Sequence, residues 1–303
     1  MKTLVVPFAF CLIAVCACAQ TGKVARPRIT GIDHVSFYTT DPEGVRALYS
    51  GTLGLASVTP VESGEFVRYL VGAQWIGYSS APDPKAIDRM DHVAFATDDV
   101  AALRKYLVAS GVKASEIERH DDQGLSFFVS DPEEHRIEFV SGGLRLKEAW
   151  LDAKPQPVSR HMIHVGFLVR NRDAEDHFYR DLLGFRLYWH GGMKPGDTDW
   201  VAMQVPDGTD WLEYMLNHPE HPDLRLTGVL NHVSLGVADM KKAQAILESH
   251  GWKPHDGEKA QMGKDGKWQL NLFDPDLTRI ELMEFKPTEK PCCAEFTGPH
   301  PSE

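Results

Sequence analysis

Four histidines recur near the start of short apolar segments that have the pattern of β-strands. In a strand, alternate side chains lie on the same face, so each histidine shares its face with the residue two positions later. Those later residues are all small. The four pairs are His34 with Ser36, His92 with Ala94, His164 with Gly166, and His232 with Ser234. Four imidazoles beside small neighbours leave room for a bound group.

Glutamates recur on strand-like segments that follow the histidine segments. Glu138 and Glu281 each follow Arg-Ile, and Glu213 lies in the sequence Trp-Leu-Glu-Tyr. In the related sequence Trp-Ile-Gly-Tyr, Gly77 stands where Glu213 stands. Imidazole and carboxylate groups both bind Zn, Ni, Fe and Mn. Because both residue types recur at matching positions of a repeat, they predict a divalent metal site.

The chain between residues 29 and 287 repeats one pattern four times: a histidine strand, a capped amphipathic helix and about three strand-like segments. Each helix is about three turns long, too short to be stable alone, so it must pack on a sheet. Asp, Asn or Pro begins each helix and Gly ends it. The pattern predicts an α+β fold of four βαβββ modules. The expected helices run from Asp41 to Gly51 and Gly54, from Asp98 or Asp99 to Gly111, from Asn171 or Asp173 to Gly184, and from Asp239 to Gly251.

The four modules form two pairs. The first and third share an aromatic-rich helix end, and the second and fourth share Asp-Pro followed by Ile-Glu, which indicates a duplicated two-module domain. The Pro-containing Lys154–Val158 is the natural linker. Short intermodule segments favour pairing of modules within one chain. The expected domains are 29–143, with modules at about 29–81 and 89–143, and 160–287, with modules at about 160–217 and 228–287; residues 144–159 link them and 288–303 form a tail.

Residues 1–19 have the pattern of an export signal. A positive charge at the start precedes an uncharged, largely apolar run from Leu4 to Cys16, and Ala17-Cys18-Ala19 matches a small-x-small cleavage site. The run is too short for a comfortable membrane span. We therefore expect an exported protein, periplasmic or secreted, whose mature chain begins near Gln20. The alternative is a lipoprotein signal in which Cys18 is acylated.

Composition and charge limit the classes of partner. The formal net charge of -11 lacks the positive footprint of a nucleic-acid binder, so a small-molecule substrate is expected. The 303 residues, 43% of them hydrophobic, are enough for two domains, as a monomer or a homodimer. Outside the signal only Cys292 and Cys293 remain. Adjacent cysteines form a strained disulfide if they form one at all, so we interpret them as a surface pair without a catalytic role.

Paired βαβββ modules, with a histidine on the first strand of each module and a glutamate on the last, resemble the vicinal oxygen chelate (VOC) superfamily. That superfamily includes glyoxalase I, extradiol dioxygenases, methylmalonyl-CoA epimerase and bleomycin-resistance proteins. The resemblance covers about residues 29–287. It implies that two modules form a U-shaped barrel of eight strands whose concave face holds a divalent metal. The chain is then expected to contain two tandem barrels.

In the C-terminal half, His164, Glu213, His232 and Glu281 resemble the four-ligand set of glyoxalase I. This resemblance implies a metal that chelates vicinal oxygens of the substrate and stabilises an enediolate, while a carboxylate moves the proton. Glu281 is the first candidate for the base and Glu213 the second. Glu281 as a ligand alone is an equal alternative.

In the N-terminal half, His34, His92 and Glu138 resemble the two-histidine, one-carboxylate set of extradiol dioxygenases, which suits Fe(II). In two-domain members of that group the metal usually lies in the C-terminal copy, which is the reverse of the arrangement here. The N-terminal residues therefore form a candidate second site, and the chemistry is expected around His232.

Three functions remain open. The first is a metal-dependent, glyoxalase-like isomerase or lyase that acts by proton transfer on a small substrate with vicinal oxygens. Export argues against glutathione as its co-substrate, because thiol cofactors are cytosolic. The alternatives are an extradiol-type ring-cleaving dioxygenase that uses Fe(II), and a non-catalytic protein that binds a small molecule. Nickel or zinc in the C-terminal half favours proton transfer, whereas iron in the N-terminal half favours oxygenation.

Overall fold

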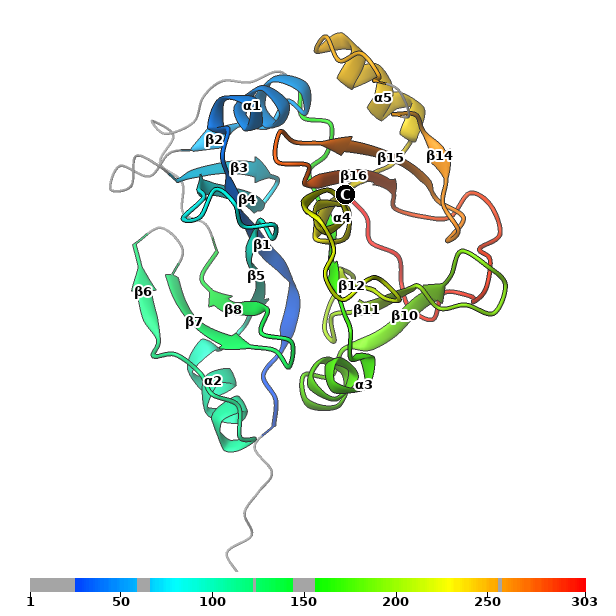
Figure 1. Cartoon of the computed structure of the whole chain (residues 1–303). Helices are drawn as coiled ribbons and strands as arrows, with labels where there is room; N and C mark the ends of the chain where they lie inside the picture. The colour runs from blue at the N-terminus through cyan, green and yellow to red at the C-terminus, as the bar shows by residue number, and fades with distance from the viewer. Residues whose placement is uncertain (1–24, 59–65, 122–123, 144–155, 256–257) are drawn as a thin grey trace, which may run out of the picture.

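The computed structural model describes residues 25–58, 66–121, 124–143, 156–255 and 258–303. The signal predicted at residues 1–19 and most of the predicted linker lie outside them. The described chain forms two eight-stranded, curled sheets, which lie side by side (Figure 1). Among the described helices none is long and apolar enough to cross a membrane.

Each sheet contains two modules joined through their histidine strands. In the first sheet β1 pairs antiparallel with β5, and each of these strands also pairs in parallel with the last strand of its own module, β4 or β8. The strand order is β2 (Ser57–Val58), β3 (Val67–Val71), β4 (Gln74–Ser80), β1 (Ile29–Thr39), β5 (Met90–Thr97), β8 (Arg136–Ser141), β7 (Gly124–Ser130) and β6 (Glu118–His120).

The second sheet repeats this topology, with β9 and β13 as its central antiparallel pair. Its order is β10 (Arg186–Gly191), β11 (Trp200–Gln204), β12 (Trp211–Met215), β9 (Met162–Leu168), β13 (His232–Val237), β16 (Arg279–Glu284), β15 (Trp268–Phe273) and β14 (Gln261–Met262). The predicted α+β fold of four βαβββ modules is therefore confirmed, and the modules pair within the chain.

The four predicted helices are present, and each begins at a polar cap. The side chains of Asp41, Asp99, Asn171 and Asp239 each accept a hydrogen bond from a backbone N–H three residues later. The helices of the first and third modules continue into π-helical turns. The helices are α1 (Pro42–Arg46) with η1 (Ala47–Thr52), α2 (Val100–Ala109), α3 (Arg172–Glu175) with η3 (Asp176–Leu182), and α5 (Met240–Ser249).

The two sheets share one hydrophobic core. It includes Val35 and Phe37 of β1 together with Val165 and Phe167 of β9. These residues alternate with His34 and His164, so the histidines lie on the faces turned away from the core. The two histidine faces are therefore on opposite sides of the shared core, and each forms the inside of one curled sheet.

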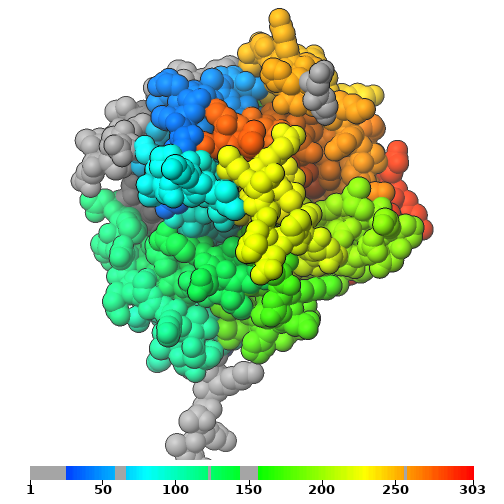
Figure 2. Space-filling model, viewed as in Figure 1, coloured from blue at the N-terminus to red at the C-terminus, as the bar shows by residue number. Residues whose placement is uncertain are grey.

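Contacts between the halves join modules that are far apart in the sequence. The Tyr179 hydroxyl of the third module donates to Asp131 of the second at 3.0 Å, and Tyr78 of the first donates to Asp274 of the fourth at 2.8 Å. The segment around α4 (Leu224–Leu230), yellow in Figure 2, lies between the two halves on the face that this figure shows. These reciprocal contacts make the two halves one packed unit.

Three features of the C-terminal half differ from the sequence interpretation. The sequence around His190, Gly191 and Gly192 is rich in glycine and predicts a connecting loop, but His190 and Gly191 end strand β10. Helix α4 precedes β13 and was not predicted. The tail does not lie apart from the domain: Thr297 donates a backbone hydrogen bond to Tyr188 at 3.0 Å, and Cys292 and Cys293 form a disulfide. The tail is therefore part of the wall of the second barrel.

Candidate metal centres

In the C-terminal half two imidazoles meet across the central strand pair. His164 on β9 and His232 on β13 have their Nε2 atoms 3.0 Å apart, and both side chains are fully buried. Glu281 on β16 brings its Oε2 to 3.3 Å from His164 Nε2. The parallel pairing of β13 with β16 sets Glu281 opposite Ser234, on the same face as His232. These three predicted ligands form one compact group.

Glu213 on β12 completes this group from the other side. Its Oε2 lies 3.5 Å from His232 Nε2 and 3.8 Å from His164 Nε2. The strand register places Glu213 opposite Gly166, which in turn faces His232. The structure therefore brings together all four residues that were predicted for the C-terminal site.

The small neighbour predicted beside each histidine has a specific function at Gly166. A Cβ atom at this position would lie 2.0 Å from Cε1 and 2.5 Å from Nδ1 of His232. The imidazole of His232 thus occupies the space that any side chain at residue 166 would need.

Gly166→Ala is expected to displace the His232 imidazole and to weaken metal binding at the C-terminal site by at least about 10-fold, the size of effect seen when a ligand is misoriented. Zinc titration against a competing chelator measures this, in a His92→Ala background that removes the N-terminal site. Ser36→Ala, at the equivalent place in the other half, serves as the control. Unchanged affinity in Gly166→Ala would show that His232 is not a ligand.

Burial dominates the electrostatics of the C-terminal group. It lowers the pKa of His164 and of His232 well below the ordinary value, so both imidazoles are neutral. Burial also raises the pKa of Glu213 to about 8, and the charge of Glu281 adds to this rise. Burial likewise raises the pKa of Glu281. Both carboxylates would be stabilised by a positive charge between them.

The C-terminal residues fit a divalent cation. His232 donates from Nδ1 to the Leu230 carbonyl at 2.8 Å, which leaves the lone pair of Nε2 directed at the group. Glu281 Oε2 is buried and has no hydrogen-bond partner among the described residues. Two neutral imidazoles and two carboxylates form a donor set that suits Zn, Ni, Fe or Mn.

The N-terminal half forms a second, similar group. His34 on β1 and His92 on β5 have Nε2 atoms 3.0 Å apart, and Glu138 Oε2 on β8 lies 3.0 Å from the first and 3.4 Å from the second. The three residues predicted for this site therefore also come together. Each imidazole has a further carboxylate on Nδ1, Asp33 or Asp91, at 2.7 Å. Such carboxylates orient histidine ligands in metal sites.

The charges of the N-terminal group are already paired. Burial opposes the ionised forms, but hydrogen bonds to Asp91 and Glu138 outweigh it and raise the pKa of His92. Hydrogen bonds from His34 and His92 similarly lower the pKa of Glu138. A bound cation would therefore stabilise the N-terminal group less than it would stabilise the C-terminal group.

Among the described residues of the N-terminal half, Gly77 stands at the position of the fourth carboxylate. The register of β4 on β1 places Gly77 opposite Ser36, the position that Glu213 occupies in the second half. A Cβ atom at Gly77 would lie 2.7 Å from atoms of Phe66 and of Trp75. Aromatic rings thus fill the place of the missing ligand.

The sequence model of the Glyoxalase/Bleomycin resistance protein/Dioxygenase superfamily matches residues 31–139 and 161–282. The chain belongs to this superfamily. Each match covers one of the two curled sheets, so the VOC architecture predicted from the histidine repeats is confirmed. A comparison with curated proteins finds no match.

Solved structures of similar fold include ring-cleaving dioxygenases. A complex of homoprotocatechuate 2,3-dioxygenase from Brevibacterium fuscum with 3,4-dihydroxyphenylacetate is 16% identical, with a TM-score of 0.65 over 91% of this chain and 84% of that one. The 2,3-dioxygenase LapB from Pseudomonas sp. KL28 is 16% identical, with a TM-score of 0.64 over 92% and 96%. These similarities concern the fold of this superfamily member.

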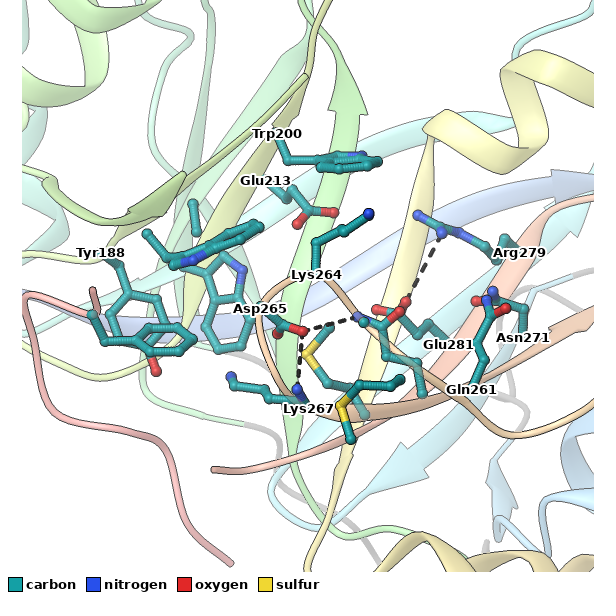
Figure 3. Close-up of a pocket in the computed structure, with 18 of the residues that line it drawn as sticks. Tyr188, Trp200, Glu213, Gln261, Lys264, Asp265, Lys267, Asn271, Arg279 and Glu281 are labelled. Carbon is teal, nitrogen blue, oxygen red and sulfur yellow. Dashed lines mark hydrogen bonds and ion pairs between the residues drawn. The ribbon is translucent and has the colours of Figure 1, made fainter. Parts of the chain in front are cut away.

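The C-terminal group of candidate ligands opens into a cavity of about 300 Å³. Glu213 and Glu281 line it, together with aromatic residues and three cations that the sequence analysis did not single out (Figure 3). Among these is Lys267, whose burial lowers its pKa to about 8. Trp211 stacks on His164 with ring centroids 4.8 Å apart, as Trp75 stacks on His34 at 3.7 Å. Because this tryptophan recurs in both halves, the sequence contained a signal from which its place beside the histidine could have been predicted.

A third group of ligand-type residues lies between the halves of this superfamily member, but its members bond to one another. Asp131 accepts from His135 Nδ1 at 2.7 Å and from the Tyr179 hydroxyl at 3.0 Å. Glu175 is fully buried beside them. Burial, together with the charge of Asp131, raises the pKa of Glu175 to about 9. In the first module the neutral Val45 stands at the position of Glu175, four residues after the helix cap.

Glu175→Gln is expected to stabilise the protein at alkaline pH. The unfolded chain ionises this carboxyl near its ordinary pKa of 4.5, whereas the folded chain keeps it protonated up to a pKa of about 9. Folding thus binds a proton in this range, and stability is lost as the pH rises from about 4.5 to about 9. The variant should raise the free energy of unfolding by about 2 kcal/mol or more at pH 8.

Urea denaturation of the wild type and the Glu175→Gln variant at pH 4.5 and pH 8 measures this difference. Little change is expected at pH 4.5, where the carboxyl is protonated in the folded chain and still half protonated in the unfolded chain. Asp173→Asn, on the exposed face of the same helix, should have little effect at either pH. Equal stabilities of wild type and Glu175→Gln at pH 8 would contradict the raised pKa.

Proposed function

We propose that the C-terminal half is a metal-dependent, glyoxalase-like isomerase or lyase that transfers a proton on a small substrate with vicinal oxygens. The observation that carries this proposal is the position of Glu213. It adds a second carboxylate beside two neutral imidazoles and Glu281, at the one place where the other half has only Gly77. A proton-transfer enzyme needs a positioned base, and a carboxylate beyond the one that holds the metal can serve as that base.

The two carboxylates have different geometries and thus different expected tasks. Glu281 is 3.3 Å from His164 and belongs to the compact group, so it is assigned as a ligand. Glu213 lies 3.8 Å from His164, farther than Glu281 does, and its side chain is 13% exposed and lines the cavity. It can therefore reach a substrate carbon and take its proton. This assignment exchanges the order of the two candidates for the base.

A divalent metal at this site would supply Lewis acidity, which makes a C–H bond beside chelated oxygens more acidic. The protein residues do the rest. His164, His232 and Glu281 hold the centre, and Trp211 fixes the His164 ring by stacking. The buried walls exclude water, which strengthens the electrostatic interactions that orient the substrate. Glu213 accepts the proton and returns it at a neighbouring position.

The test is exchange of a substrate C–H proton with solvent deuterium. The protein from residue 20 onward, loaded with nickel or zinc under nitrogen, is incubated with a panel of α-hydroxy ketones and α-keto aldehydes, and exchange is followed by proton NMR. Metal-dependent exchange supports the proposal. Bound metal without exchange in any compound would favour the non-catalytic binding protein, and absence of bound metal would overturn both.

A second candidate function is a ring-cleaving dioxygenase that uses Fe(II). It is favoured by the two-histidine, one-carboxylate groups in both halves and by the fold shared with extradiol dioxygenases. Oxygen uptake by the iron-loaded protein on catechols, without deuterium exchange, would select this function over proton transfer.

We also propose that the protein acts outside the cytoplasm. The apolar run that begins at Leu4 and the cleavage-type sequence Ala17-Cys18-Ala19 support export. The Cys292–Cys293 disulfide fits an oxidising compartment. Mass spectrometry of the protein from cell fractions tests this proposal: a mature chain beginning near Gln20 is expected, and a cytoplasmic chain that retains Met1 would overturn it.

A further inference from the structure

Lys267 is a buried cation beside the C-terminal metal centre. It lies in the turn between β14 and β15, its residue is 0% exposed, and it lines the cavity. Its Nζ atom has no hydrogen-bond partner among the described residues. An ammonium group has three donors, and leaving them unsatisfied away from water is costly. The position therefore calls for an acceptor that a ligand would bring.

Three aromatic rings surround this ammonium group. Nζ lies 4.6 Å from the ring centroid of Trp211, 5.1 Å from that of Phe296 and 5.5 Å from that of Tyr188. Cation–π attraction stabilises the charge at such distances. The rings provide no strong hydrogen-bond acceptor, so they hold the cation in place and leave its donors free.

Trp211 connects Lys267 with the metal centre. The Trp211 ring contacts both residues: the His164 imidazole stacks on the indole at 4.8 Å, and Nζ of Lys267 lies 4.6 Å from the indole centroid. Glu281 lines the same cavity (Figure 3). A small molecule in the cavity can thus face the metal ligands with one end and Lys267 with the other.

With a divalent metal bound, the cavity would carry a net positive charge, which favours an anion. Its ionisable side chains balance one another: three cations, Lys264, Lys267 and Arg279, and three acids, Glu213, Asp265 and Glu281. A divalent metal would add two positive charges to this balance. The loaded cavity therefore favours a substrate that carries negative charge away from the oxygens at the metal.

We propose that Lys267 forms a carboxylate subsite, so that the substrate is a small organic acid whose vicinal oxygens face His164, His232 and Glu281. This inference rests on the proposed function, because it takes the same cavity as the substrate site. It adds the chemical class of the substrate, which the fold of the superfamily does not specify.

The test compares two probes that both offer vicinal oxygens, 3,4-dihydroxybenzoate and its methyl ester. Each is titrated calorimetrically at pH 7 into the zinc-loaded protein in a His92→Ala background. The wild-type C-terminal site is expected to bind the acid at least about 10-fold more tightly than the ester, the range of a charge-assisted hydrogen bond. Lys267→Met should reduce that preference to less than about 3-fold. Lys264→Met, which removes an exposed cation of the same cavity, should retain it.

The two proposals fail in different ways. Equal binding of acid and ester by the wild type would overturn the subsite while leaving the metal centre intact. Unchanged preference in Lys267→Met would do the same, and the wild-type ratio decides the question even if that variant does not fold. Loss of zinc binding by the His92→Ala protein would instead overturn the proposed function.

Discussion

Replacing His232 by alanine is expected to remove one equivalent of divalent metal from the protein and to weaken zinc or nickel binding at the C-terminal site by at least about 100-fold. Residues that only orient ligands already contribute 10- to 100-fold to metal affinity, and His232 would be a ligand itself. Its Nε2 lies 3.0 Å from His164 and 3.5 Å from Glu213, within the group of candidate ligands. Elemental analysis after dialysis against a weak chelator measures the loss.

His92→Ala is the matched control, because His92 holds the same position in the other sheet. This variant should keep the C-terminal metal. If His232→Ala retained all its metal while His92→Ala lost it, the chemistry would have to be assigned to the N-terminal half, and the dioxygenase function would become the stronger candidate.

Glu213→Gln is expected to lower the rate of deuterium exchange by about 100- to 10,000-fold, the usual contribution of a positioned general base. The amide has nearly the shape of the carboxylate but cannot accept a proton at this pH. Because His164, His232 and Glu281 remain, zinc should stay bound. NMR exchange rates and metal content are measured on the same samples, so that loss of the base is distinguished from loss of the metal.

The opposite pattern is expected for Glu281→Gln, which should lose metal and activity together. Glu138→Gln, the equivalent change in the N-terminal half, should leave exchange unaffected. Full activity in Glu213→Gln would return the role of base to Glu281 or show that the reaction is not a proton transfer.

The fold and both ligand groups could be predicted because they repeat. Alternation around His34, His92, His164 and His232 fixed the faces of four strands, and the duplication aligned Glu213 with Gly77. Helix caps such as Asp41 and Asp239 marked where helices begin. Each of these signals depends on residues that are close together in the chain, and several of them repeat. They can therefore be recognised in a single sequence.

The features that the sequence analysis missed depend on contacts between distant segments. Lys267 lies in a polar turn that looks like any exposed loop. Its burial involves Phe296 of the distant tail, which packs against Tyr188 at 4.8 Å and lies 5.1 Å from Nζ of Lys267. Asp33 and Asp91 were adjacent to histidines in the sequence, yet a residue next in a strand points to the other face unless the strand is irregular. Register shifts beside both histidines in β1 and β5 bring these carboxylates to Nδ1.

The core shared by the two sheets has a thermodynamic consequence. Because Val35 and Val165 belong to one packed cluster, and Tyr78 and Tyr179 each bond across to the opposite half, neither sheet can unfold without exposing the other. Binding at one concave face should then stabilise both halves by mass action. Heating would show a single cooperative transition, and zinc at the C-terminal centre would protect the amides of β5 from hydrogen exchange as well as those of β13.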